Sequence, residues 1–275
     1  MDSYFFVPGY KLGNIDKIKA LGVDEIIIDL EDAVKASDRQ MILSRLLSDD
    51  INYKEYYIRI PLYDYQGKID AQLLLSLLEN GFRKLVFPKI SSLEDFEFIH
   101  SYFVNFSPAI ILLVETPRLL LEAKDLLLKY KKFISGVAVG SHDFMNTVGG
   151  VHSLRNLEFF RLQILYLARM IHVKAIDIAS MELQDTQSLE AEIKDGVYKG
   201  FDAKLYIHPK QLEVLKSIKL YSTDELAWAH GVEDAFKQTQ GKADEFNPVV
   251  IDGVIIEKPH LRRAAKILNY YNENI

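Results

Sequence analysis

The chain has 275 residues, of which 49% are hydrophobic and 26% charged, and its net charge of −6 excludes a general nucleic-acid-binding surface, which needs excess positive charge. It contains no cysteine, which excludes disulfides, a thiolate nucleophile and a cysteine-ligated zinc site. The first residues lack the basic start and long apolar core of a signal peptide, and the longest apolar runs are too short to span a bilayer, so we expect a cytoplasmic protein with neither a membrane nor a nucleic-acid partner.

Short apolar, β-branched or aromatic runs recur along the first 210 residues. They are continuous rather than alternating, as in strands that are buried on both faces of a parallel sheet. Eight such runs are present, at residues 4–7, 25–29, 56–60, 84–88, 109–115, 134–140, 175–180 and 203–207.

Helical patterns lie between these runs, at residues 14–21, 67–80, 117–130, 153–172 and 186–198. Strands that alternate with helices indicate a parallel sheet. Eight strands close a (β/α)₈ TIM barrel, whose usual length is about 250 residues. We therefore predict a barrel, with a doubly wound open sheet as the alternative fold.

The pattern changes after His208. Helical patterns appear at 209–217, 223–238 and 259–271, and residues 245–259 form an irregular arm with a short β-like piece. We predict a catalytic barrel domain over residues 1–220. Residues 221–275 are predicted to be a C-terminal helical and irregular extension that packs on the barrel or on a neighbouring subunit.

Charged and polar side chains follow most of the predicted strands. In a (β/α)₈ barrel the active site lies at the carboxyl ends of the strands, so these side chains converge if the barrel is correct. In chain order the groups are Pro8 with Gly9, the acids Asp29, Glu31 and Asp32, then Arg59, Lys89, Glu115, Asp143, Ser180 and His208.

Glu115 and Asp143 follow neighbouring strands, and two such carboxylates can chelate a hard cation such as Mg²⁺, which is usually held by one or two protein carboxylates. The acids after the second strand could hold the water ligands of the metal or take a proton from a substrate hydroxyl. Arg59 is placed to bind an anionic oxygen.

Each of these side chains also has a structural interpretation. Glu115 could be a helix-start acid favoured by the helix dipole. Asp143 could cap the loop after Gly140, Arg59 could be an ion-pair partner, and His208 could mark the entry to a helix. Three acids at one strand end are harder to explain structurally, because they repel one another without cationic partners.

Together these segments resemble the citrate lyase β-subunit-like branch of the HpcH/HpaI aldolase superfamily. The resemblance rests on the order of several motifs across residues 4–215 and a tail segment at 253–268. The motifs are FVPG (6–9) with Lys17, IDLEDAV (28–34), IRI (58–60), FPK (87–89), LVETPR (113–118), VGSHDF (139–144) and GFDAKLYIHPKQL (200–212).

The resemblance implies a Mg²⁺-dependent carbon–carbon lyase, often trimeric, acting on β-hydroxyacyl thioesters such as citryl-, malyl- or citramalyl-CoA. It implies that Glu115 and Asp143 are the metal ligands, that Arg59 binds substrate, and that Lys17 lies towards the CoA phosphates. Asp29, Glu31 and Asp32 match the acidic cluster around the water shell of the metal.

This chain also departs from the family pattern. His142 replaces an acid beside Asp143, and Glu257 stands where some members have a catalytic aspartate. The resemblance thus gives Asp29, Glu31, Asp32, Arg59 and Glu257 as catalytic residues. The substrate-binding candidates are Lys17, Arg59, Lys89, Glu115 and His208.

The leading hypothesis is a Mg²⁺-dependent lyase that cleaves a short β-hydroxyacyl-CoA or forms it by Claisen condensation, working as a homo-oligomer, with a trimer favoured. A second hypothesis is a CoA-independent 2-oxo acid aldolase. A third is a non-catalytic subunit of a lyase complex.

Overall fold

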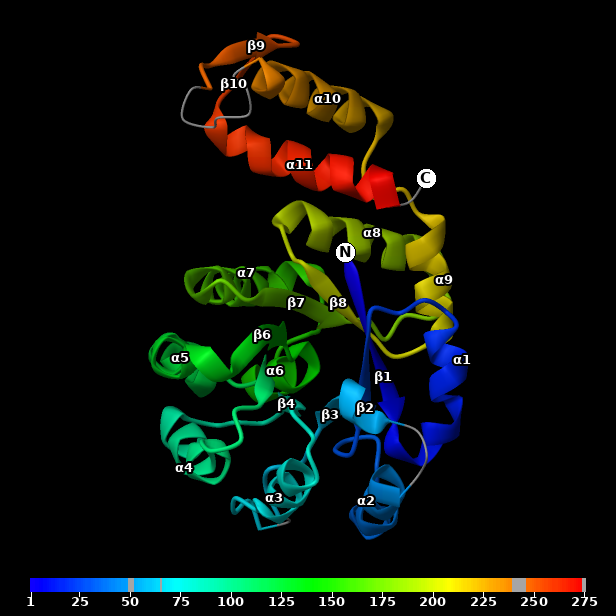
Figure 1. Ribbon diagram of the computed structural model, residues 1–275, viewed down its shortest axis with the longest axis vertical. Coiled ribbons are helices and arrows are strands. Elements are labelled where there is room, and N and C mark those ends of the chain that lie inside the picture. The colour runs from blue at the N-terminus through cyan, green and yellow to red at the C-terminus, as the bar shows by residue number, and fades with distance from the viewer. Residues whose placement is uncertain (49–51, 65, 239–245, 274–275) are drawn as a thin grey trace. The chain divides into compact units, whose positions relative to one another are not determined.

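Eight parallel strands, hydrogen-bonded to one another in sequence order, close into a barrel because β8 pairs with β1 (Figure 1). The computed structural model describes residues 1–48, 52–64, 66–238 and 246–273. The strands are β1 Asp2–Pro8, β2 Glu25–Asp29, β3 Tyr57–Arg59, β4 Lys84–Phe87, β5 Ala109–Val114, β6 Ile134–Val139, β7 Lys174–Ala179 and β8 Ala203–Tyr206. The closure confirms the predicted (β/α)₈ fold and excludes the open sheet.

The inside of the barrel is filled by side chains from all eight strands. They form one buried cluster of Tyr4, Ile27, Tyr57, Val86, Ile111, Leu113, Ala138, Ile176, Ala203 and Leu205. Each large apolar side chain buried in this way contributes roughly 1.5–3 kcal/mol. The inside of the barrel is therefore a packed core.

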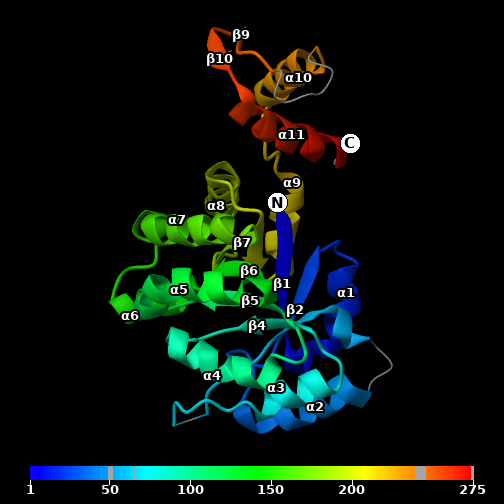
Figure 2. The same ribbon diagram turned by 60° about the vertical axis from the view of Figure 1, so that its left-hand side comes forward.

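Helices follow the strands and surround the barrel, as Figures 1 and 2 show. They are α1 Ile15–Lys19, α2 Arg39–Ser48, α3 Gln72–Glu79, α4 Leu93–Phe103, α5 Pro117–Tyr130, α6 Ser141–Val148, α7 Leu154–Ile171, α8 Thr186–Lys199 and α9 Pro209–Ser217. Three of them, α2, α4 and α6, were not among the predicted helices.

Local sequence explains the start of α5. The side chain of Thr116 accepts a hydrogen bond from the Leu119 N–H at 3.1 Å, and Pro117 occupies the first turn, where its missing N–H costs nothing. Thr116 is therefore the N-cap, and Glu115 remains at the end of β5 with its carboxylate free for other contacts.

Residues Met1–Ser217 form one compact unit and residues Ile218–Ile275 a second. The second unit contains α10 Thr223–Lys237, the hairpin strands β9 Val249–Ile251 and β10 Val254–Ile256, and α11 Lys258–Glu273. The hairpin accounts for the described part, residues 246–259, of the predicted irregular arm; residue 245 lies outside the described residues. Packing of this extension on the barrel or on a neighbour stays a prediction.

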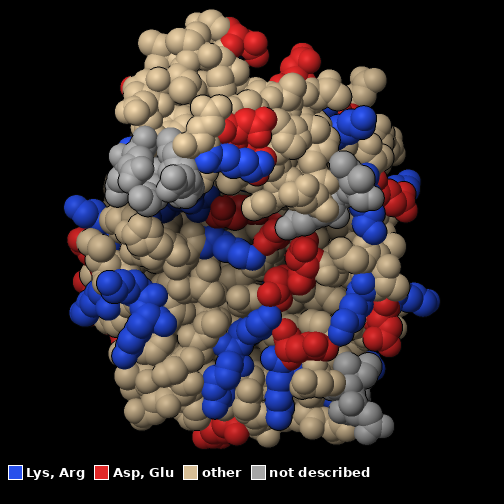
Figure 3. Space-filling model, turned by 45° about the horizontal axis from the view of Figure 1, so that its top comes forward, with Lys and Arg blue, Asp and Glu red and all other residues tan. Residues whose placement is uncertain are grey.

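Surface charge is mixed in sign. On the face drawn in Figure 3, lysine and arginine side chains are interspersed with aspartate and glutamate. Among the described residues, the structure contains no helix that is long and apolar enough to cross a membrane.

Candidate functional site

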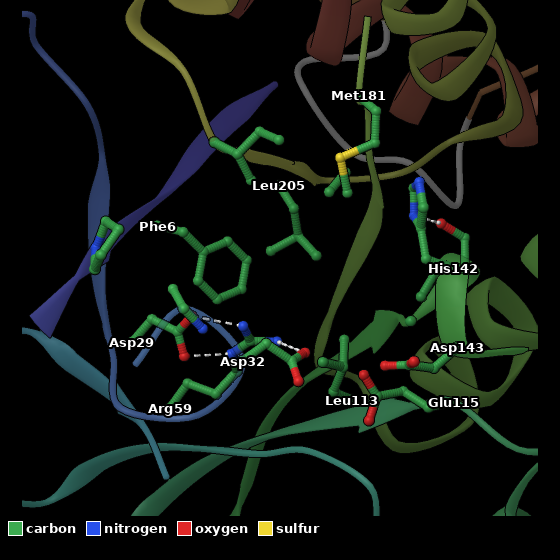
Figure 4. A pocket seen from close by; sticks show the side chains of 17 residues that line it. Phe6, Asp29, Asp32, Arg59, Leu113, Glu115, His142, Asp143, Met181 and Leu205 are labelled. Atoms are coloured by element: carbon green, nitrogen blue, oxygen red, sulfur yellow. Dashed lines mark hydrogen bonds and ion pairs between the residues drawn. The ribbon is translucent and has the colours of Figure 1, made fainter. Parts of the chain in front are cut away.

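A cavity of about 330 Å³ lies where the carboxyl ends of the strands meet (Figure 4). One part of its wall is polar and another apolar. The lining residues are Phe6, Pro8, Asp29, Asp32, Ala33, Arg59, Leu113, Glu115, Val139, Gly140, Ser141, His142, Asp143, Ala179, Met181, Leu205 and Ile207. Five of the predicted site residues, Asp29, Asp32, Arg59, Glu115 and Asp143, therefore face one cavity.

Asp29, the last residue of β2, holds the guanidinium of Arg59 at the end of the adjacent strand β3. Arg59 donates from Nε to Oδ1 at 2.7 Å and from Nη2 to Oδ2 at 2.6 Å, a two-point ion pair. The Asp29 carboxylate also accepts hydrogen bonds from the backbone N–H groups of Glu31 and Ala33. Arg59 packs over the ring of Phe6, with 4.8 Å between its Cζ and the ring centroid. The arginine is thus fixed in one orientation.

Glu31 and Asp32 share two cations. The Lys89 Nζ lies 2.5 Å from Glu31 Oε1 and 2.6 Å from Asp32 Oδ1, and Arg59 Nη1 lies 3.5 Å from Glu31 and 3.4 Å from Asp32. Burial raises the pKa of Glu31, although both cations oppose the shift. Burial acts in the same direction on Asp32, but Lys89, Glu31 and Arg59 outweigh it and lower the pKa of Asp32 below its ordinary value.

Glu115 and Asp143 approach each other from β5 and from the first turn of α6 (Figure 4). Glu115 is only 2% exposed, and Oε2 accepts a hydrogen bond of 2.5 Å from the backbone N–H of Lys89. Gly140 permits this approach, because a Cβ at residue 140 would overlap the Glu115 side chain. Burial raises the pKa of Glu115 to about 8, and the charge of Asp143 adds to the shift, whereas the Lys89 N–H opposes it.

These two carboxylates fit a hard divalent cation. The burial of Glu115 and the nearby charge of the half-buried Asp143 make ionisation of Glu115 unfavourable, and a cation between the two carboxylates would supply the missing positive charge. The described residues contain no cluster of three or more histidine, aspartate or glutamate side chains arranged around one metal position. Mg²⁺ is often held by one or two protein carboxylates with water or substrate as the other ligands, and Glu115 with Asp143 can provide such a pair.

A serine and two histidines form a hydrogen-bonded group beside the carboxylates. Ser141 is 3% exposed, and its Oγ lies 3.0 Å from His152 Nε2 and 3.3 Å from His142 Nδ1. Burial lowers the pKa of both imidazoles. The sequence showed His142 as a departure from the family pattern, but not its contact with Ser141 or the part of His152.

The apolar wall was also absent from the predicted site. It contains apolar residues two positions apart at three strand ends, namely Phe6 with Pro8, Ala179 with Met181 and Leu205 with Ile207, together with Leu113, which lies two positions before Glu115. Residues two apart on a strand face the same side, so this spacing could have predicted the wall once the strand ends were known.

Glu31 and Lys89 do not line the cavity but contact residues that do, whereas Lys17 and His208 are not part of its wall. Lys17 is exposed on α1. His208 is engaged in the entry to α9, where its Nδ1 accepts from the Lys210 N–H and its own N–H donates to Gln211, as the structural interpretation predicted. Glu257 is exposed in the second unit, directly before α11.

Comparison with known proteins supports the family resemblance that the sequence motifs indicated. Residues 2–209 match the family model described as HpcH/HpaI aldolase/citrate lyase. A (3S)-malyl-CoA thioesterase of Cereibacter sphaeroides is 27% identical, over 97% of this chain and 93% of the relative. The mitochondrial citramalyl-CoA lyase of Homo sapiens is also 27% identical, over 94% of this chain and 82% of the relative.

Solved structures share the fold. Protein CitE from Mycobacterium tuberculosis, in complex with magnesium, acetoacetate and coenzyme A, has a TM-score of 0.81 with 24% identity and covers 98% of both chains. RipC from Yersinia pestis has a TM-score of 0.67 with 24% identity, covering 82% of this chain and 98% of that chain. Both likenesses concern the path of the backbone.

Proposed function

The chain belongs to the HpcH/HpaI aldolase/citrate lyase family, and from this premise we propose that it is a Mg²⁺-dependent carbon–carbon lyase acting on a short β-hydroxyacyl-CoA. The observation that carries the proposal is the pair Glu115 and Asp143, two carboxylates facing a cavity that Arg59 also lines. Relatives named for malyl-CoA and citramalyl-CoA, and a related fold crystallised with magnesium and coenzyme A, support the substrate class.

Glu115 and Asp143 would hold the metal. Bound Mg²⁺ would act as a Lewis acid towards a carbonyl oxygen of the substrate. Arg59, held by Asp29, presents positive charge where the oxygen of a thioester enolate becomes negative. Preorganised charge of this kind is often the largest contribution to catalysis, and the loss of one donor costs about 10²–10³ in rate.

The proton of the substrate hydroxyl leaves to a carboxylate of the acidic cluster. Asp32 is the best placed, because it lines the cavity and its lowered pKa keeps it ionised at neutral pH. As the carbon–carbon bond breaks, the hydroxyl carbon becomes the carbonyl of an oxo acid and the bonding electrons pass to the enolate of the acyl-CoA. A proton from an acid then completes the acyl-CoA, and we assign this role to Glu257 of the C-terminal extension.

The apolar wall favours a substrate with a small alkyl substituent. Arg59 is the one lysine or arginine among the described residues that line the cavity, and it is already assigned to the enolate oxygen, so a second carboxylate on the substrate would find no cation there. Opposite it, Leu205, Met181 and Ile207 offer only apolar contact. We therefore propose a pyruvate-type oxo acid as product rather than a dicarboxylic one, with Lys17 towards the CoA phosphates.

The test uses purified protein with Mg²⁺, acetyl-CoA or propionyl-CoA, and either pyruvate, glyoxylate or oxaloacetate, and follows formation of the hydroxyacyl-CoA by mass spectrometry. We expect condensation that requires Mg²⁺ and prefers pyruvate over oxaloacetate. Release of pyruvate from free hydroxy-oxo acids but not from CoA esters would favour the CoA-independent aldolase. An inert chain that co-purifies with a stoichiometric partner would favour the non-catalytic subunit.

A second candidate activity is hydrolysis of the thioester. It is supported by the contact between Ser141 Oγ and His152 Nε2, which lie 3.0 Å apart. A serine and histidine within hydrogen-bonding reach can activate a nucleophile or a water molecule. The same assay separates the two reactions, because hydrolysis gives CoA and a free hydroxy acid, whereas cleavage gives acyl-CoA and an oxo acid.

A further inference from the structure

Lys89, in the turn after β4, has a left-handed backbone. Its φ is 55°, a backbone conformation that residues other than glycine, asparagine and aspartate rarely adopt. The other non-glycine residues with positive φ in the described chain are explained by a helix end (His172), a hairpin turn (Asp252) and a surface connection (Ser107). Strained backbone of this kind persists only where the surroundings enforce it, and it concentrates at functional sites.

Lys89 contacts both acidic groups of the site through different atoms. Its backbone N–H donates to Glu115 Oε2 at 2.5 Å, towards the neighbouring strand β5. Its ammonium group contacts Glu31 at 2.5 Å and Asp32 at 2.6 Å, beyond strand β3 on the other side. One residue therefore links Glu115, a proposed metal ligand, to the acidic cluster across the ends of four adjacent strands.

The Lys89 side chain is 41% exposed, but its exposed part lies outside the cavity. It is not part of the cavity wall, and its ammonium already has two carboxylate partners. The sequence suggested a substrate-binding lysine, whereas the contacts indicate a different role.

We propose that Lys89 is a positioning residue, whose backbone N–H fixes one oxygen of Glu115 while its ammonium holds Glu31 and Asp32 in place for proton transfer. This inference rests on the proposed function, since it assigns Lys89 a part in the same reaction. It also predicts a property that can be measured without catalysis, namely Mg²⁺ binding. The N–H that contacts Glu115 belongs to the backbone, so it remains when the Lys89 side chain is replaced.

The experiment compares Lys89→Met and Lys89→Arg with a matched control, Lys84→Met, which removes an ion pair with Glu25 at the opposite end of the same strand. We expect Lys89→Met to lower kcat by about 10- to 100-fold with little change in KM, because the proton acceptor is misplaced. Lys89→Arg should recover most of kcat, and Lys84→Met should keep both constants. A raised KM with unchanged kcat would overturn the proposal in favour of substrate binding, and unchanged kcat and KM would overturn it altogether.

Calorimetric titration with Mg²⁺ provides a readout independent of activity. Lys89→Met should bind Mg²⁺ at least as tightly as the wild type, because the N–H to Glu115 remains and one positive charge is gone. A tenfold weaker affinity would show that the side chain only supports the fold, and would overturn the proposal. The Mg²⁺ titration can overturn the proposal about Lys89 even if the wild type has no lyase activity, so failure of the proposed function and failure of this inference can be told apart.

The strain can be tested separately by thermal unfolding of Lys89→Gly and Lys89→Ala. Both lose the ammonium and keep the N–H, but only glycine adopts a left-handed backbone without penalty. We expect the glycine variant to unfold at the higher temperature. The reverse order would contradict the left-handed conformation on which the inference depends.

Discussion

Arg59 and Asp29 form a two-point ion pair at the ends of adjacent strands, with Nε–Oδ1 and Nη2–Oδ2 distances of 2.7 and 2.6 Å. Asp29 is 2% exposed, so its removal would leave the guanidinium without its main partner in a largely buried position. Breaking a buried ion pair by removing one member typically costs about 3–5 kcal/mol. The pair therefore ties the orientation of the arginine to the stability of the fold.

The first prediction is that Asp29→Asn lowers the free energy of unfolding by about 3 kcal/mol and also lowers kcat, because Arg59 is no longer fixed. Urea denaturation and steady-state kinetics measure the two effects. The control is Glu94→Gln, which removes an exposed partner of Arg118 and should cost less than about 1 kcal/mol. Equal costs for the two variants would contradict the structural importance of the pair.

The second prediction concerns metal binding by Glu115. Mg²⁺ at a hundred times its dissociation constant should stabilise the wild type by about 2.7 kcal/mol, since a ligand that binds only the folded state shifts the unfolding equilibrium. Glu115→Gln should gain almost none of this and should lose about 10²–10³ in kcat. Thermal denaturation with and without Mg²⁺ measures the first effect. Equal stabilisation of both proteins would place the metal elsewhere.

The third prediction is a pH dependence of the metal-free protein. The pKa of Glu115 is raised in the folded state to about 8, so its stabilising contribution is complete below its ordinary pKa and is lost as the pH rises through about 8. In EDTA we expect the free energy of unfolding to fall by several kcal/mol between pH 5 and pH 9 relative to Glu115→Gln. Urea denaturation at a series of pH values measures the difference. Parallel curves for the two proteins would rule out an uncompensated carboxylate at this position.

Much of the barrel could be predicted from sequence because buried parallel strands are continuous apolar runs, and all eight were located to within about two residues. Helix α2 was missed because Met41 and Leu47 are exposed, which blurs the amphipathic pattern. Helix α6 begins inside the motif after β6, whose polar residues are equally typical of a loop, so the sequence does not mark its start.

The acids and Arg59 could be predicted because they directly follow strands, and strand ends converge in a barrel. The role of Lys89 could not, since its contact with Glu115 uses a backbone N–H that every residue except proline possesses. The contact between Ser141 and His152 also has no sequence signal, because it depends on how the chain turns between α6 and α7.

The fourth prediction tests the close approach of Gly140, which follows β6, to Glu115. In Gly140→Ala the new methyl group would overlap the Glu115 side chain and push its carboxylate away from Asp143. We expect Mg²⁺ affinity to fall at least about tenfold, the equivalent of 1.4 kcal/mol. Gly13→Ala is the matched control, because a Cβ at residue 13 meets no atom within 4 Å, and its affinity should equal that of the wild type. Unchanged Mg²⁺ binding in Gly140→Ala would mean that Glu115 is not a ligand.

The fifth prediction concerns Glu257 in the second unit. If it supplies the final proton without binding metal, Glu257→Gln should lower kcat while leaving the Mg²⁺ dissociation constant unchanged, the opposite of Glu115→Gln. A second experiment mixes Glu115→Gln with Glu257→Gln. If the extension covers the site of a neighbouring subunit, some sites in the mixed oligomers combine an intact Glu115 from one chain with an intact Glu257 from the other. Co-refolding the two inactive proteins should then restore part of the activity. Mixtures that stay inactive, although each variant alone keeps its oligomeric state, would place Glu257 at the site of its own chain or outside the reaction.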